Sequence, residues 1–112
     1  VIAQDYGAIE VHFLGHRRDV GAILRDAADV CVASAREEAL PLNVLEAQCV
    51  GVPLVVSDIP AHREALQPGT RPPVPVEDAA ALADALLALR ADPTARARAA
   101  AVREAARARF SM

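Results

Sequence analysis

Two glutamates, Glu38 and Glu46, lie on either side of Pro41 in the segment REEALPLNVLEAQCVGVPLVVSD, which covers residues 36–58. An ionised carboxylate accepts hydrogen bonds and donates none, so each can receive two sugar hydroxyls at once. The residues from Leu40 to Asn43 predict the start of a helix, where unpaired backbone N–H groups and the helix dipole favour a phosphate. Acceptors for hydroxyls beside a site for phosphate indicate a nucleotide-sugar as the ligand.

The elements that must hold these acids are expected from short apolar runs separated by amphipathic segments. Runs rich in β-branched residues predict strands, and apolar residues spaced three and four apart predict helices. The strands are expected at Val11–Leu14, Val30–Ala33 and Val52–Ser57, with a brief edge strand near Val74–Val76. Because strands that are apolar on both faces need helices on both sides, the alternation predicts an α/β fold with a parallel sheet and right-handed crossovers.

Helix boundaries are predicted from capping residues. Asp19 and Asp78 each precede a helical stripe of apolar residues and are expected to be N-caps. Asp92 followed by Pro93 predicts the start of the last helix. Gly51 follows the central helix and is expected in the left-handed C′ position that ends it.

The predicted topology brings the two acids to one edge of the sheet. Glu38 falls in the loop after the second strand, and Glu46 falls in the second turn of the helix that follows. Both therefore lie at the carboxyl edge, where open parallel sheets bind their ligands.

Length and charge exclude several classes of function. The 112 residues fit one small domain with an aliphatic core. The net charge of −3 gives no basic field for nucleic acid, and no window approaches the roughly 20 apolar residues of a membrane span. Cys31 and Cys49 lack metal-ligand spacing and are expected to be reduced thiols, which favours a cytoplasmic protein.

An ordered set of motifs runs through the chain: FLG at residues 13–15, DVCVAS at 29–34, the glutamate pair followed by Ala47, GVPLVVSD at 51–58 and RE at 63–64. From Val11 to Leu89 this set resembles the carboxy-terminal domain of the retaining GT-B glycosyltransferases called group 1 or family 4. The signature of that family is a pair of glutamates separated by seven residues and followed by a Gly-Val-Pro turn. The resemblance implies a Rossmann-like parallel sheet flanked by helices, as a truncated C-terminal domain of a GT-B fold.

The resemblance also implies roles for individual residues. Glu46 resembles the acid that binds the ribose of the donor nucleotide, and Glu38 resembles the catalytic-site acid near the hydroxyls of the transferred sugar. The residues expected to present the diphosphate with backbone amides are Leu40, Pro41, Leu42 and Asn43, and those expected to border the base are Gly15, His16 and Arg17. The family stabilises the leaving diphosphate generally without a metal, and this sequence has no Asp-x-Asp pair, so no metal or cofactor is expected.

Residues 1–112 are interpreted as a single partial domain, the latter part of a donor domain. The Arg and Lys that clamp the diphosphate in the family, and the amino-terminal acceptor domain, are expected outside these residues. The full-length protein is expected to transfer a hexose from a nucleotide diphosphate sugar to an acceptor, with retention. It is expected in the cytoplasm or at the inner face of a membrane, and the fragment alone is expected to be inactive.

Two other functions fit the same residues. The first is a catalytically idle Rossmann-like module for nucleotide binding or regulation, and the second is a GT-B relative that epimerises a sugar nucleotide or phosphorolyses a sugar. The pair of Glu38 and Glu46 favours the transferase over the idle module, because a module that binds no donor has no physical need for both acids.

Further charged residues have roles that the sequence leaves open. His62, Arg63 and Glu64 follow the third strand, where helix capping, local pairing and ligand contact are all open. Three arginines (Arg96, Arg103 and Arg107) share one face of the last helix. A solvated face is favoured over binding of anionic lipid, because no Leu or Trp anchors accompany these arginines.

Overall fold

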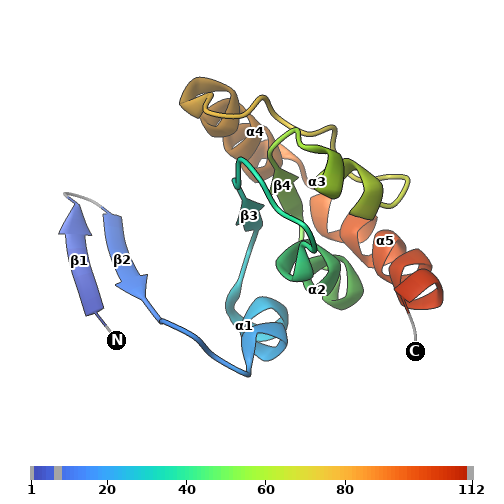
Figure 1. The fold of residues 1–112 in the computed structure, drawn as a ribbon, viewed down its shortest axis with the longest axis horizontal. Helices are drawn as coiled ribbons and strands as arrows, with labels where there is room; N and C mark the ends of the chain where they lie inside the picture. The colour runs from blue at the N-terminus through green and yellow to red at the C-terminus, as the bar shows by residue number, and fades with distance from the viewer. Residues whose placement is uncertain (1, 7–8, 111–112) are drawn as a thin grey trace.

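The computed structural model describes residues 2–6 and 9–110, and within them it contains four short strands and five helices (Figure 1). In chain order these are β1 (Ile2–Tyr6), β2 (Ile9–Phe13), α1 (Val20–Ala27), β3 (Cys31–Ala33), α2 (Leu42–Val50), β4 (Leu54–Val56), α3 (Pro60–Ala65), α4 (Ala79–Ala91) and α5 (Ala95–Phe110). From α1 onward, strands and helices alternate until α3. The chain is thus an α/β protein, as its sequence predicts.

The centre of the fold is the parallel pair of β3 and β4, in which Cys31 lies opposite Leu54. A parallel bridge between Ser57 and Val74 adds a third piece of chain at the far edge of β4. This bridge is the observed form of the edge strand expected near Val74–Val76. The expectation of a parallel sheet flanked by helices is confirmed, although the strands are short.

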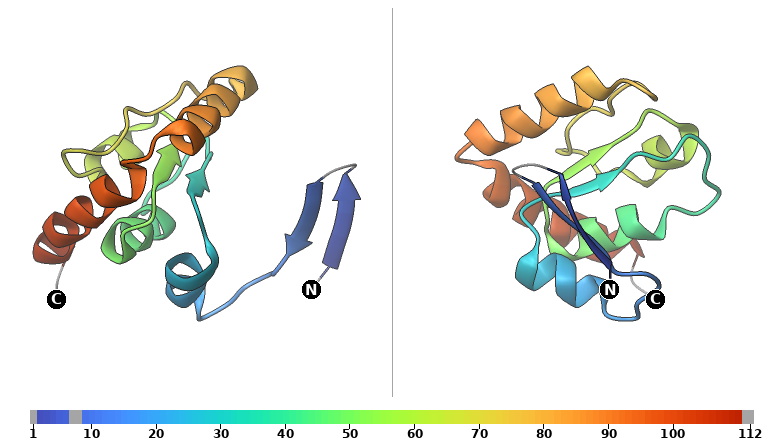
Figure 2. Two further views of the ribbon diagram at one scale, coloured as in Figure 1. Left: turned by 180° about the vertical axis from the view of Figure 1, so that it is seen from behind. Right: turned by 90° about the vertical axis from the view of Figure 1, so that its left-hand side faces the viewer.

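The two faces of the sheet are covered by different helices (Figure 2). Cys31 and Ala33 are buried in the core cluster together with residues of α2, whereas Val32, between them, points to the other face and is 39% exposed. On that other face, Leu82 of α4 lines a cavity with Val32 and Val55. Helix α5 packs against α2, so the most thickly covered side of the sheet is the side of α2.

The first predicted strand does not join the parallel sheet. Strand β2 pairs antiparallel with β1, with Tyr6 opposite Ile9, and the hairpin stands apart from β3 and β4 (Figures 1 and 2). Ile9 and Phe13 are more than half exposed. The expectation that Val11–Leu14 belongs to the parallel sheet is therefore wrong for this structure. Pairing between neighbouring segments closes a very short loop at little entropic cost, and this favours the hairpin.

Helix α2 is fixed at its end by the turn that the sequence predicts. Gly51 adopts φ of +83° and its N–H donates to the carbonyls of Ala47 and Gln48. A Cβ at Gly51 would stand 3.5 Å from the carbonyl oxygen of Ala99 and from Arg103. The left-handed backbone and the approach of α5 both favour glycine at this position.

Of the three aspartates expected to be N-caps, Asp78 caps its helix as predicted, and Asp19 and Asp92 do not. The side chain of Asp78 accepts from the amide of Ala81 at 2.9 Å and caps α4 as predicted. Asp19 precedes α1, but its carboxylate accepts from Arg17 and makes no capping bond. Asp92 ends α4 and accepts from the amide of Thr94, so α5 begins only at Ala95 and not at Pro93.

Buried Gln48 joins α2 to the segment after α3. Its side-chain amide donates to the carbonyl of Ala65 at 2.9 Å, and its side-chain oxygen accepts from the backbone amide of Gln67 at 2.8 Å. Gln48 is only 2% exposed, so water does not replace these bonds. This polar link inside an aliphatic core holds α2 and α3 in one arrangement.

Within the described ranges, no helix is both long and apolar enough to cross a membrane. Cys31 is buried, Cys49 is half-buried, and both are free thiols, as expected.

Replacing Gln48 with Met tests the polar link. The change keeps the size of the side chain but leaves the carbonyl of Ala65 and the amide of Gln67 buried without their partner. The free energy of unfolding should fall by about 1–3 kcal/mol in urea titrations. Leu42→Met, at a position of the same helix that is 58% exposed, should change it by less than about 0.5 kcal/mol. Equal effects of the two substitutions would contradict this role of Gln48.

Candidate functional site

The start of α2 is the part of the site that the backbone forms. Pro41 is buried and occupies the N-cap position, and it has no N–H to offer. The amide of Leu42 donates to the carbonyl of Leu40 at 3.0 Å, and the amide of Val44 donates to the side chain of Asn43 at 3.0 Å. The amide of Asn43 has no acceptor among the described residues. This helix start therefore offers an anion one unpaired amide in its first turn, together with the positive end of its dipole.

Leu40 and Leu42 border this helix start with their side chains in solvent. They are 62% and 58% exposed, and Asn43 is exposed too. Exposed leucines at the mouth of a polar site give a ligand an apolar surface to lie on.

Glu38 reaches from the preceding loop toward the interior. Its carboxylate oxygen Oε2 lies 3.0 Å from Nε2 of His62, and the Glu38 side chain is 27% exposed whereas that of His62 is fully buried. One end of the carboxylate is thus held by the protein, while its position at the edge of the sheet leaves part of the group open to solvent.

Glu46 occupies a different environment. It is exposed on α2, and its Oε2 atom lies 3.5 Å from the place where a Cβ would stand on Gly21. Gly21 belongs to the first turn of α1, so the carboxylate faces the positive end of that helix. Its charge also reaches Cys31: burial is the main cause that raises the pKa of the Cys31 thiol, and the negative charge of Glu46 adds to the effect.

The residues expected at the base-binding end lie between β2 and α1. Gly15, His16 and Arg17 are all exposed, and a Cβ at Gly15 would meet nothing within 4 Å. Arg17 makes a forked ion pair with Asp19, with both N···O distances 2.7 Å. In the described part of the chain, no hydrogen bond or ion pair joins this segment to either acid. Glu38 precedes the start of α2 and Glu46 lies in the second turn of that helix, whereas this segment lies in solvent.

His62 is a residue whose role the sequence leaves open, and the structure gives its contacts. It follows β4 as Glu38 follows β3, and the carboxyl ends of parallel neighbours meet at one edge, so their juxtaposition was accessible from topology alone. The next two residues, Arg63 and Glu64, make contacts elsewhere. Arg63 forms a forked ion pair with Asp58, which lowers the pKa of that carboxyl, and the carbonyl of Glu64 accepts from Arg109.

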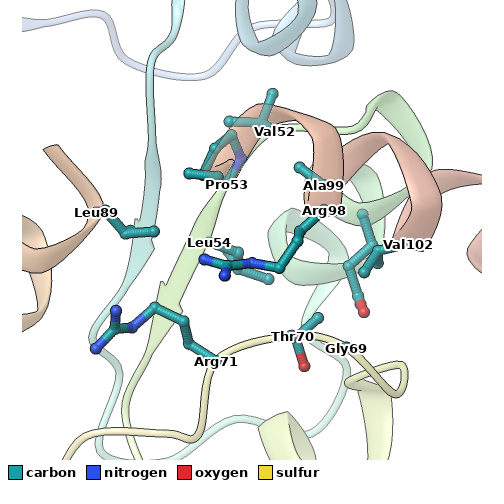
Figure 3. A pocket seen from close by; sticks show the side chains of 12 residues that line it. Val52, Pro53, Leu54, Gly69, Thr70, Arg71, Leu89, Arg98, Ala99 and Val102 are labelled. Atoms are coloured by element: carbon teal, nitrogen blue, oxygen red, sulfur yellow. The ribbon is translucent and has the colours of Figure 1, made fainter. Parts of the chain in front are cut away.

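Three hollows beside the sheet are lined by neither Glu38 nor Glu46. One is at the amino end of β4, between Pro53, Thr70 and α5 residues such as Ala99 (Figure 3), and its volume is about 30 Å³, room for little more than a water molecule. The second holds about 400 Å³ at the carboxyl end, on the face of Val32, and Arg36 contributes to its lining. The third holds about 570 Å³ at the amino end of the sheet, between Val30, Pro53 and Leu89. The second has the size of a small-ligand site and adjoins the loop that carries Glu38.

Over the ranges that the structure covers, no group of three or more His, Cys, Asp or Glu side chains is placed to hold a metal ion.

Glu38 and the start of α2 lie at the carboxyl edge of a parallel α/β sheet, the edge at which open sheets of this class bind their ligands. Residues 2–92 match the family model described as glycosyl transferases group 1, and the chain belongs to this family. The resemblance to its carboxy-terminal domain is confirmed.

One relative in particular supports this membership. The phosphatidyl-myo-inositol mannosyltransferase of Mycobacterium leprae (strain TN) is 40% identical over 91 residues, which make up 78% of this chain and 24% of that protein. The chain thus spans about a quarter of the relative it matches. No solved structure matches the chain.

The effect of Glu46 on Cys31 gives a test of the site in the free protein. In a Cys49→Ser background, Cys31 is the sole thiol, and its rate of alkylation by iodoacetamide follows the thiolate fraction. Glu46→Gln removes a charge that raises the pKa of this thiol, so alkylation should become faster at a given pH. The increase should stay below about tenfold, because burial is the larger cause and remains. Glu37→Gln, a nearby exposed glutamate, should leave the rate unchanged, and an equal increase there would contradict the local effect.

Proposed function

We propose that this chain forms the donor-binding part of a glycosyltransferase that moves a hexose from a nucleotide diphosphate sugar to an acceptor, with retention of configuration. The observation that carries the proposal is the start of α2 at the carboxyl edge of a parallel sheet, preceded by Glu38 and followed by Glu46 in the second turn, in a member of this family. An idle module and an epimerase or phosphorylase are the functions that its test must separate from transfer.

The two acids take different parts of the donor in this proposal. Glu46, exposed beside the first turn of α1, accepts the ribose hydroxyls. Glu38 keeps one carboxylate oxygen on His62 and accepts hydroxyls of the transferred sugar with the other. Gly15, His16 and Arg17 border the base. Because no hydrogen bond or ion pair joins that segment to the acids in the described chain, its part in the site requires it to approach α1 when the donor is bound.

The leaving diphosphate is the group whose charge grows during transfer. The amide of Asn43 and the dipole of α2 are fixed before the reaction, so they stabilise that charge without reorganising. The proposal assigns no metal to this step, in line with the lack of an Asp-x-Asp pair. Chelation with EDTA is therefore expected to leave the rate of transfer unchanged, whereas restoration of the rate by a divalent cation would contradict this part.

The name of the similar mycobacterial protein suggests the first donor and acceptor to try. It is described as a mannosyltransferase acting on phosphatidyl-myo-inositol, so we propose mannose as the first sugar and an inositol lipid as the first acceptor. Because the match covers 24% of that protein, residues 1–112 alone are expected to bind a nucleotide and transfer nothing.

Calorimetric titration with UDP, GDP and ADP tests donor binding, on residues 1–112 and on the protein at the full length that its gene encodes. One of the three should bind, and Glu46→Ala should weaken its binding by about tenfold or more, because a charged acceptor for two hydroxyls is lost. Glu37→Ala is the matched control and should bind as the wild type does. If the full-length protein, with its fold intact, binds none of them, the idle-module alternative is favoured.

A further inference from the structure

His62 joins three pieces of chain at the edge of the sheet. It is fully buried on α3, and its two ring nitrogens face opposite ways. Nδ1 lies 2.9 Å from the carbonyl oxygen of Ser57 and 3.3 Å from the Ser57 hydroxyl, while Nε2 lies 3.0 Å from Oε2 of Glu38. The Ser57 hydroxyl in turn donates to the carbonyl of Ala35 at 2.5 Å, in the loop that leads to Glu38.

The hydrogen-bond chemistry fixes which atoms carry hydrogen. A carbonyl oxygen only accepts, and the Ser57 hydroxyl donates its hydrogen to the carbonyl of Ala35. Nδ1 of His62 is therefore the donor to the carbonyl oxygen of Ser57. Nε2 and a carboxylate oxygen of Glu38 are both acceptors unless one of them is protonated. A close contact at 3.0 Å therefore requires one proton between His62 and Glu38.

The loop that carries Glu38 has few other ties. Arg36 forms an ion pair with Glu77 at 2.9 Å, but the two side chains are 75% and 61% exposed, and such pairs contribute little. Among the described residues, His62 is the one hydrogen-bonding partner of the Glu38 carboxylate, and Oε1 of Glu38 has none. The direction in which Glu38 presents its free oxygen thus depends on a buried ring from another element.

We propose that His62 is a positioning residue for Glu38: its imidazole ring, anchored on Ser57, holds Oε2 and leaves Oε1 to accept a hydroxyl of the transferred sugar. This role rests on the proposed function, because it assigns the free oxygen of Glu38 to the donor sugar. His62 itself touches no substrate in this arrangement and acts through Glu38 alone.

The contact itself is tested by nitrogen NMR of histidine in the free protein. With 15N-labelled histidine, Glu38→Ala should shift the Nε2 resonance of His62 more than its Nδ1 resonance, because Ser57 still accepts from Nδ1. Exposed His12 and His16 serve as internal controls and should not move. Glu38 lies in a partly exposed loop, so this variant keeps the core. An unchanged Nε2 resonance would overturn the proposal whether or not the protein binds a nucleotide.

The positioning role is tested by a pair of matched substitutions in the full-length protein. His62→Asn can still donate to Ser57 but is too short to reach Glu38, whereas His62→Gln can place an N–H near the position of Nε2. His62→Asn should weaken binding of the nucleotide sugar by about tenfold, with the free nucleotide bound within about twofold of wild type. His62→Gln should recover part of the loss, and failure to do so would count against positioning.

A double-mutant cycle separates positioning from a general effect on the fold. Glu38→Gln combined with His62→Asn should bind the nucleotide sugar no more weakly than Glu38→Gln alone, because His62 acts only through Glu38. Additive losses, or equal loss of the free nucleotide, would overturn the role. If the wild type binds no nucleotide, the proposed function fails and this role with it, while the NMR result still reports the contact. If His62→Asn does not fold, the NMR arm decides.

Discussion

The parallel pairing of β3 with β4 is the constraint on which the site depends. Because both strands run the same way, the segments that follow them leave from the same edge. Glu38 lies in one of these segments and His62 in the other, 24 positions apart in the chain, and they meet at 3.0 Å. Helix α2, packed on the sheet and on α5, begins at the same edge and carries Glu46 in its second turn.

The two glutamates of the pair are unlike each other despite their identical chemistry. Glu38 is partly buried and is hydrogen-bonded to the buried ring of His62, so its orientation is restricted. Glu46 stands in solvent beside a glycine, and its surroundings restrict it less. Under the proposed function, the ordered acid is the one assigned to the transferred sugar, and the freer acid is the one assigned to the ribose that all nucleotides share.

Much of this structure was predictable because its signals are local. The left-handed turn at Gly51 and the cap of α4 by Asp78 depend on neighbours within a few residues, and both are present. The pairing partner of β2 was not predictable from its apolar pattern, which is equally typical of a sheet strand and of a hairpin strand. For His62, topology alone places the residue at the same edge as Glu38, but its hydrogen bonds were not predictable, because a buried histidine has several ways to satisfy its nitrogens.

The link from Ala35 through Ser57 and His62 to Glu38 also has a consequence for the order of folding. The bond from Ser57 to Ala35 and the bond between His62 and Glu38 each join the loop after β3 to the segment after β4. The bond between His62 and Ser57 holds the ring in the position from which it reaches Glu38. The orientation of Glu38 is therefore a late event, which awaits closure of the whole β3–α2–β4 unit and the docking of α3. A partly folded chain that keeps its helices and the hairpin presents no ordered acid at position 38, so this acid is oriented only in the finished tertiary structure.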